Sequence, residues 1–168
     1  PMFSLTKILW FQRQRPDIYD AAWKFLCFGD YIALRLGAEP CIDYTMAART
    51  MAFDIRTMSW CERILSICSI STSKLPLPVS PGTVIGQVTA PAALRAGLPA
   101  SAYIVAGAHD QICCALGAGV YRSGIAMDSL GTTESLLCVQ DSAVVTPAMM
   151  RNNLPCYPYP LPGCYAYL

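Results

Sequence analysis

The stretch VAGAHDQICCALGAG, from Val105 to Gly119, places three polar residues between two apolar runs. The apolar run AYIVAGA has the length and composition of a strand inside a sheet, and Gly107 ends it. Asp110 therefore stands at the carboxyl end of a predicted strand, before a predicted helix over residues 111–118. In the simplest interpretation Asp110 only caps this helix and Gln111 is a surface residue.

A chemical interpretation stays open beside the structural one. In open α/β sheets, ligands bind beyond the carboxyl ends of the strands. A carboxylate there can serve as a general base toward a hydroxyl group, which contributes roughly 10²–10⁴-fold in rate. Gln111 offers a donor and an acceptor, which suits it to orient a polyol. His109, the single histidine of the chain, either contacts a substrate or packs at the start of the helix.

Composition narrows the class of protein. Of the 168 residues, 54% are hydrophobic and 14% are charged, against a usual charged share of about a quarter. This shortage indicates burial between subunits or a piece of a larger protein, and a homo-oligomer stays open. The net charge of +1 is spread along the chain, so we expect no nucleic-acid or membrane partner. Without an apolar span of about twenty residues or a signal peptide, a soluble cytoplasmic protein is predicted.

Nine cysteines form no CxxC pair, and two of them, Cys113 and Cys114, are adjacent. With one histidine available, this spacing argues against a zinc site. The pattern predicts reduced, buried thiols of a cytosolic protein and no metal ligands, and it leaves surface disulfides open as the alternative.

Periodicity, prolines and glycines predict a mixed α/β order of elements. The first elements are a helix over 5–14 and a second helix over 17–36, which Asp17 caps and Gly37 ends. A short helix or turn from Tyr44 and a helix capped by Ser59 follow, and then an extended connection over 74–82. The last elements are a strand over 83–89, a helix over 90–98 ended by Gly97, two strands within 123–140, and an irregular tail over 151–168.

The turn between the last two predicted strands reads LGTTES, from Leu130 to Ser135. A glycine followed by hydroxyl residues lets backbone N–H groups approach a phosphate closely. The same residues also suit an ordinary hairpin turn at Gly131, Thr132 and Thr133, and the pattern leaves both interpretations open.

Four segments together resemble the FGGY family of carbohydrate kinases. They are MFSLTKILWFQRQ (2–14), IDYTMAARTMAFDIRTMSW (42–60), VAGAHDQ (105–111) and DSLGTTE (128–134). The first segment carries a spaced Lys-apolar-x-Trp pattern at Lys7 and Trp10, residues that could otherwise be a solvent-reaching cation and a packed aromatic. Order and spacing agree over residues 2–163.

The resemblance implies an actin-like, ribonuclease H-like ATPase fold, here incomplete. Residues 1–119 would be the C-terminal part of the family's N-terminal, sugar-binding domain. Residues 120–168 would begin its C-terminal, nucleotide-binding domain. The implied activity is ATP-dependent phosphorylation of a sugar or polyol hydroxyl.

The resemblance also implies roles for individual residues. Asp110 would take the proton from the attacking hydroxyl, and Gln111 and His109 would contact the substrate. Gly131 with Thr132 and Thr133 would hold nucleotide phosphates, and we expect this turn to lie beside Asp110 at an open cleft. The implied cofactors are ATP and Mg²⁺, with the metal ligands mainly in family segments that precede these residues.

Two departures from the family pattern qualify these expectations. Met2 stands where glycerol kinases place a tyrosine in the substrate pocket, and a thioether cannot donate that hydrogen bond, which argues against glycerol. The family's first phosphate loop, Asp-x-Gly-Thr, and its adenosine-binding segment do not occur in this sequence. We therefore expect a fragment of an active kinase that is inactive alone. The alternative is a non-catalytic actin-like pseudokinase, or a degraded gene product that at most binds ligands.

Overall fold

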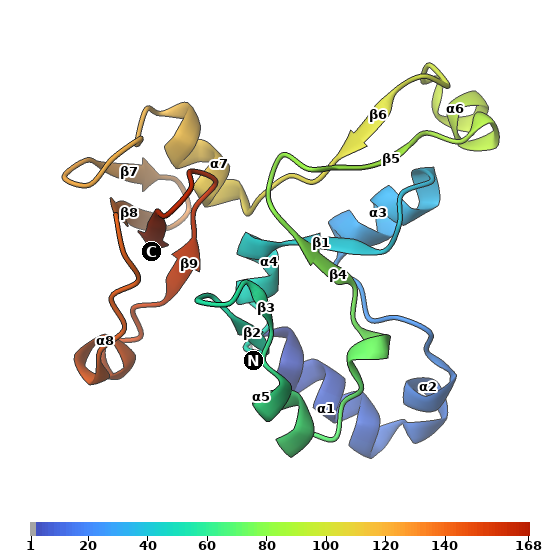
Figure 1. The fold of residues 1–168 in the computed structure, drawn as a ribbon, viewed down its shortest axis with the longest axis horizontal. Helices are drawn as coiled ribbons and strands as arrows, with labels where there is room; N and C mark the ends of the chain where they lie inside the picture. Colours follow the sequence, from blue (N-terminus) through green and yellow to red (C-terminus); the bar gives the residue numbers. More distant parts are fainter. Residues whose placement is uncertain (1–2) are drawn as a thin grey trace.

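The structure is a computed structural model that describes residues 3–168, so the predicted substrate residue Met2 lies outside the described residues. Figure 1 shows two lobes. The chain up to about Val105 forms one lobe, and the chain from Asp110 onward forms the other, with a short crossing segment between them.

The chain begins with helix α1 (Ser4–Gln14), which confirms the helix expected over 5–14. The single helix expected over 17–36 is wrong, because α2 (Pro16–Ala21) and α3 (Phe28–Leu36) are separate. The Lys74 ammonium donates to backbone carbonyls at the end of α2, those of Tyr19, Asp20 and Ala22. These tertiary hydrogen bonds satisfy carbonyl groups at the α2 C-terminus, where the helix ends. The chain between α2 and α3 is extended.

Of the two helix boundaries expected here, the cap at Asp17 is wrong and the stop at Gly37 is confirmed. Asp17 is not the cap of α2, because Arg15 precedes the helix and Pro16 occupies its first position. Asp17 instead pairs with the Arg15 guanidinium at 2.8 Å. Gly37 ends α3 as expected, with a φ of +123° that an L side chain rarely adopts.

Strand β1 (Cys41–Asp43) pairs in parallel with β4 (Leu77–Val79). The extended connection expected over 74–82 thus contains a strand, preceded by the 3₁₀ turn η1 (Thr72–Lys74). The short helix expected from Tyr44 is confirmed as α4 (Tyr44–Ala48).

Strands β2 (Phe53–Asp54) and β3 (Ser59–Trp60) form a small antiparallel hairpin before α5 (Glu62–Ile67). Ser59 is therefore not a helix cap, and that prediction is wrong. The Trp60 ring packs edge-on against Phe53, and its Nε1–H donates to the Pro76 carbonyl at 2.9 Å. These contacts keep Trp60 out of the following helix.

Strands β5 (Val84–Gln87) and β6 (Tyr103–Val105) pair antiparallel, and helix α6 (Ala90–Ala96) lies between them in the chain. Helix α6 ends at Gly97 as expected, and this glycine adopts the left-handed conformation. The expectation that β6 lies inside a sheet is wrong for the described chain. Its only partner there is β5, and Tyr103 and Val105 are exposed.

The second lobe is built on a four-stranded antiparallel sheet of order β7-β8-β10-β9. Strands β7 (Ala126–Leu130) and β8 (Glu134–Gln140) confirm the hairpin with its turn at 131–133. The irregular tail expected over 151–168 is wrong, because it holds β9 (Cys156–Pro158) and β10 (Tyr165–Tyr167), which follow α8 (Pro147–Arg151). Prolines end or follow β9 on the sheet edge, where a missing N–H is tolerated.

Helix α7 (Asp110–Gly117) confirms the helix expected over 111–118 and packs on this sheet. Its Ile112 and Ala115 share one buried cluster with Leu137 and Val139 of β8. Asp110 is the first helical residue and His109 the cap position, so the expectation that Asp110 caps the helix is wrong.

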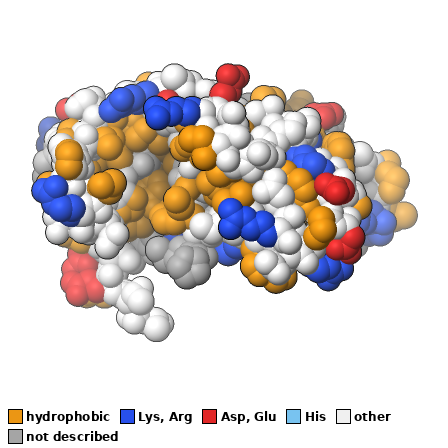
Figure 2. Space-filling model, turned by 90° about the horizontal axis from the view of Figure 1, so that it is seen from below, with side chains coloured by type: hydrophobic (Ala, Val, Ile, Leu, Met, Phe, Trp, Pro, Cys, Tyr) orange, Lys and Arg blue, Asp and Glu red, His pale blue; other side chains and the backbone are white. Residues whose placement is uncertain are grey.

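Apolar side chains also line two sizeable cavities. One of about 710 Å³ lies among α1, α3 and the segment 24–29. Another of about 510 Å³ lies between the β2–β3 hairpin and residues 144–156. Figure 2 views the molecule from below and shows apolar side chains gathered around a hollow on this lower face. Among the described residues, no helix combines the length and apolarity that a membrane crossing requires.

Candidate active site

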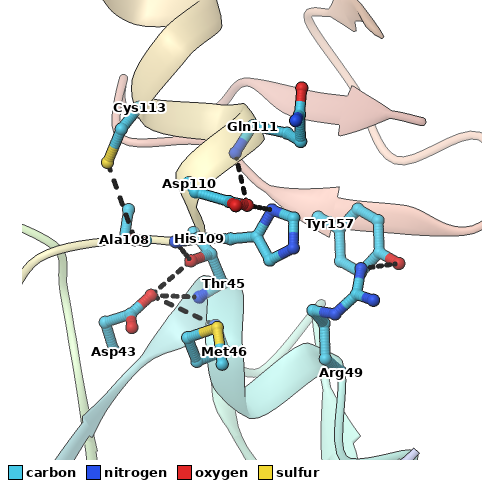
Figure 3. Close-up of polar contacts among 10 residues, drawn as sticks. All are labelled: Asp43, Thr45, Met46, Arg49, Ala108, His109, Asp110, Gln111, Cys113 and Tyr157. Atoms are coloured by element: carbon cyan, nitrogen blue, oxygen red, sulfur yellow. Dashed lines mark hydrogen bonds and ion pairs between the residues drawn. The ribbon is translucent and has the colours of Figure 1, made fainter. Parts of the chain in front are cut away.

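Asp110 lies at the N-terminus of α7 with its side chain 83% exposed. Its Oδ1 accepts the backbone N–H of Gln111 at 2.7 Å and lies 3.3 Å from Nδ1 of His109 (Figure 3). Backbone N–H groups at a helix N-terminus have no partner within the helix, and this carboxylate binds one of them. The arrangement provides a hydrogen-bond acceptor that faces solvent.

His109 packs at the start of α7. Its side chain is 14% exposed, and its ring stacks nearly parallel to Tyr157, with centroids 6.3 Å apart. Burial, and then the charge of Arg49, lower the pKa of His109 below its ordinary value of 6.5. The imidazole is therefore neutral at pH 7, so its contact with the Asp110 carboxylate is not an ion pair at that pH.

Arg49 and Tyr157 continue this stack and tie the lobes together. Nη1 of Arg49, just after α4, donates to the Tyr157 hydroxyl on β9 at 3.1 Å. The guanidinium carbon also lies 5.7 Å from the centre of the Tyr157 ring. Helix α4 and strand β9 are in contact along this line, so the stack joins both lobes beside Asp110.

A buried polar pair supports the backbone at the same place. The N–H of His109 donates to Oγ1 of Thr45 at 2.7 Å, and Thr45 Oγ1 donates to Asp43 Oδ1 (Figure 3). Asp43 also caps α4 by accepting the N–H groups of Thr45 and Met46. Burial raises the pKa of Asp43, while these hydrogen bonds act in the opposite direction.

Gln111 leaves one polar atom unsatisfied. Its Oε1 is buried and has no hydrogen-bond partner among the described residues. Such an atom costs about 1–3 kcal/mol. A donor from a bound ligand would remove that cost.

The turn at Gly131, Thr132 and Thr133 is exposed on the same lobe as Asp110. Gly131 has no left-handed φ, and a Cβ there would meet only the Thr133 carbonyl at 3.9 Å. Neither backbone conformation nor steric space therefore requires glycine at this turn. Neither Asp110 nor this turn borders the main cavities of the described chain.

Residues 3–168 hold no cluster of three or more His, Cys, Asp or Glu side chains that could bind a metal. All nine cysteines are free thiols. The expectation of buried thiols is wrong for Cys113 and Cys114, which are exposed, and only Cys41 is fully buried.

Sequence reasoning assigned no role to Thr45, Arg49 or Tyr157. Asp43 stands directly before α4, where an aspartate is a recognisable helix cap, and Thr45 follows within the helix. The contact of Thr45 with His109 spans 64 residues of sequence, and no local spacing could have indicated it. Tyr157 lies in the tail that was expected to be irregular.

Comparisons with known proteins agree with this fold. A xylulose kinase of Klebsiella pneumoniae is 31% identical over 147 residues, which cover 88% of this chain and 30% of that protein. An autoinducer-2 kinase of K. pneumoniae subsp. pneumoniae is 31% identical over 121 residues, or 72% of this chain and 23% of that protein. The crystal structure of a ligand-bound xylulose kinase from Lactobacillus acidophilus superimposes with a TM-score of 0.90 at 25% identity, covering 99% of this chain and 33% of the other.

These likenesses define the class as an α/β protein with the actin-like, ribonuclease H-like fold, present here in part. The sequence model of the FGGY family of carbohydrate kinases, N-terminal domain, matches residues 1–117. The chain therefore belongs to the FGGY family, and it spans about 30% of the length of the xylulose kinase it matches.

Proposed function

We propose that a full-length protein carrying these residues is an ATP-dependent kinase of a sugar or polyol hydroxyl, with Asp110 as general base. The observation that carries the proposal is the exposed Asp110 carboxylate at the N-terminus of α7, in a chain of a carbohydrate-kinase family. In this proposal residues 1–119 belong to the sugar-binding domain and residues 120–168 begin the nucleotide-binding domain.

The proposed reaction needs little covalent chemistry from the protein. Asp110 accepts the proton as the hydroxyl oxygen forms its bond to phosphorus, and the β–γ bridging oxygen leaves on ADP. ATP bound with Mg²⁺ supplies the phosphoryl group, and the metal ligands would come from parts of the fold outside this chain. The exposed Gly131–Thr133 turn suits a phosphate, and the unsatisfied Oε1 of Gln111 suits a substrate hydroxyl.

The substrate class remains broad within this proposal. The relatives are named for xylulose and autoinducer-2, and Met2 argues against glycerol because a thioether donates no hydrogen bond. A panel of ketoses, polyols and aldonates, with glycerol included, tests which hydroxyl compound is phosphorylated. A cytoplasmic location without nucleic-acid or membrane partners belongs to the same proposal.

The central test is Asp110→Asn in the full-length protein. Loss of a general base should lower kcat by at least about 100-fold. Asp141→Asn is the matched control, since it removes an exposed carboxylate from the same lobe and should leave kcat within about twofold. Near-wild-type turnover by Asp110→Asn would remove Asp110 from the role.

The isolated 168-residue chain should release no ADP in a coupled assay with any substrate of the panel. It lacks the family's Asp-x-Gly-Thr phosphate loop, so the phosphates would not be held for transfer. Turnover by the isolated chain would contradict this expectation. A full-length protein that is folded but inactive on the whole panel would favour the non-catalytic pseudokinase or the degraded gene product.

A further inference from the structure

Buried polar side chains concentrate in one short block of the first lobe. Asp43, Thr45 and Thr50 are the buried polar or charged residues of the described chain, and Thr45 has no exposed surface. A buried hydroxyl is retained at low cost only where its hydrogen bonds are made. Thr45 makes one of them with the backbone of His109, directly before Asp110.

The chemistry of the partners fixes the direction of both hydrogen bonds. A backbone N–H can only donate, so Thr45 Oγ1 accepts from His109. Asp43 Oδ1 already accepts the N–H groups of Thr45 and Met46, so it acts as an acceptor and Thr45 Oγ1 donates its proton to it. A charged acceptor polarises the hydroxyl and makes its oxygen a better acceptor for the His109 N–H. Asp43 is itself held at the N-terminus of α4.

The segment that this contact anchors is held at its start by backbone hydrogen bonds of Ala106 with Thr83 and Gly82, and at its end by the His109 ring packed on Tyr157. Residues 106–109 cross from β6 to α7, and Gly107 among them is exposed with no atom within 4 Å of where its Cβ would lie. The N–H of His109, at the cap position, is outside the hydrogen-bond ladder of α7. This N–H is the backbone donor directly before Asp110, so what it binds contributes to the position of the first residue of α7.

We propose that Thr45, oriented by Asp43, is a positioning residue that fixes the crossing segment and so sets the Asp110 carboxylate for proton transfer. Thr45 touches no reacting atom and acts through the His109 backbone. The inference rests on the proposed function, because it assigns Asp110 the role of general base.

The first test measures hydrogen exchange of individual backbone amides in the 168-residue chain by NMR. In the unmodified chain the His109 amide should be protected. Thr45→Val keeps the side-chain shape but removes the hydroxyl, and should speed His109 exchange at least about tenfold relative to Ile112. Thr45→Ser should restore most of the protection.

Thr50→Val is the matched control. Thr50 is also buried and hydrogen-bonded, but its hydroxyl bonds to Ala47 and Ala52 and not to the crossing segment. It should leave His109 exchange unchanged even where it lowers the overall stability. An unprotected His109 amide in the unmodified chain would overturn the inference, whether or not Thr45→Val folds. Equal loss of protection in Thr50→Val would overturn it as well.

The second test measures kinetics in the full-length protein. Misplacing a catalytic group should lower kcat while leaving the KM for ATP within about twofold, and we expect at least a tenfold loss for Thr45→Val with recovery in Thr45→Ser. If Asp110→Asn inactivates the enzyme but Thr45→Val leaves kcat unchanged, the positioning role of Thr45 is overturned. The proposed function then still stands. Unchanged kcat in Asp110→Asn overturns the proposed function, while the exchange experiment still decides whether Thr45 anchors the segment.

Discussion

Asp30 shows how a capping residue can carry a pH dependence. Its Oδ2 accepts the backbone N–H of Cys27 at 2.9 Å and so closes the N-terminus of α3. Burial, aided by the nearby charge of Asp43, raises the pKa of Asp30 from 3.8 to about 6. Because the folded pKa exceeds the unfolded one, the protonated form stabilises the fold below pH 4, and this stability is lost as the pH rises through about 6.

Asp30→Asn should therefore flatten the stability profile between pH 4 and pH 7. Asparagine keeps an oxygen that can accept the Cys27 N–H, but it does not titrate. The measurement is the free energy of unfolding from urea titrations at a series of pH values. Asp20→Asn, at an exposed position of α2, should keep the profile of the unmodified chain. A profile unchanged by Asp30→Asn would show that other groups carry the dependence.

Gly86 and Gly117 differ in the space available for a side chain. At Gly86, in β5, a Cβ would lie 2.7 Å from the Cα of Ala38 and 3.2 Å from the Gly37 carbonyl. The register of β5 against β6 also shifts there. At Gly117, in α7, a Cβ would meet nothing within 4 Å. The end of α3 thus reaches β5 only because residue 86 has no side chain.

The same substitution at both positions should change stability in opposite directions. Gly86→Ala forces backbone apart and should cost about 1–3 kcal/mol. Gly117→Ala restricts the unfolded chain without strain and should gain about 0.5 kcal/mol. Urea unfolding of both variants beside the unmodified chain gives the comparison. A neutral Gly86→Ala would mean that α3 can move away from β5.

Exposed apolar surface favours self-association of the whole chain. The cavity of about 710 Å³ is bordered by Phe25, Leu26 and Phe28, and Phe28 is 90% exposed. Contiguous apolar surface of this kind drives association in water, whereas single exposed apolar residues are ordinary.

Phe28→Ser should accordingly reduce self-association of the isolated chain at micromolar concentration. Leu94→Ser is the control, because Leu94 is 86% exposed but does not border the cavity. Light scattering after size-exclusion chromatography measures the mass of each variant. Equal effects of the two substitutions would show that association depends on total exposed apolar area and not on this patch.

Sequence patterns within one element predicted the helices and the hairpin whose first and last residues are set by nearby residues. Helix α1 and helix α6 follow from apolar periodicity, and α6 ends at Gly97 because that glycine adopts the left-handed conformation. The hairpin around Gly131 and the position of Asp110 at the start of a helix follow from the same local signals. The motifs that indicate the FGGY family are likewise short and local.

Partners distant in the chain decided the rest. The break between α2 and α3 depends on Lys74, and the strands of the tail exist because β10 pairs with β8 and β9. The site divides in the same way: the sequence determined which carboxylate begins α7, while only the tertiary structure joined Thr45 and Tyr157 to His109. Periodicity reports what one element buries, but a hydrogen bond across 64 residues depends on how separate elements pack, and no pattern within either element encodes that geometry.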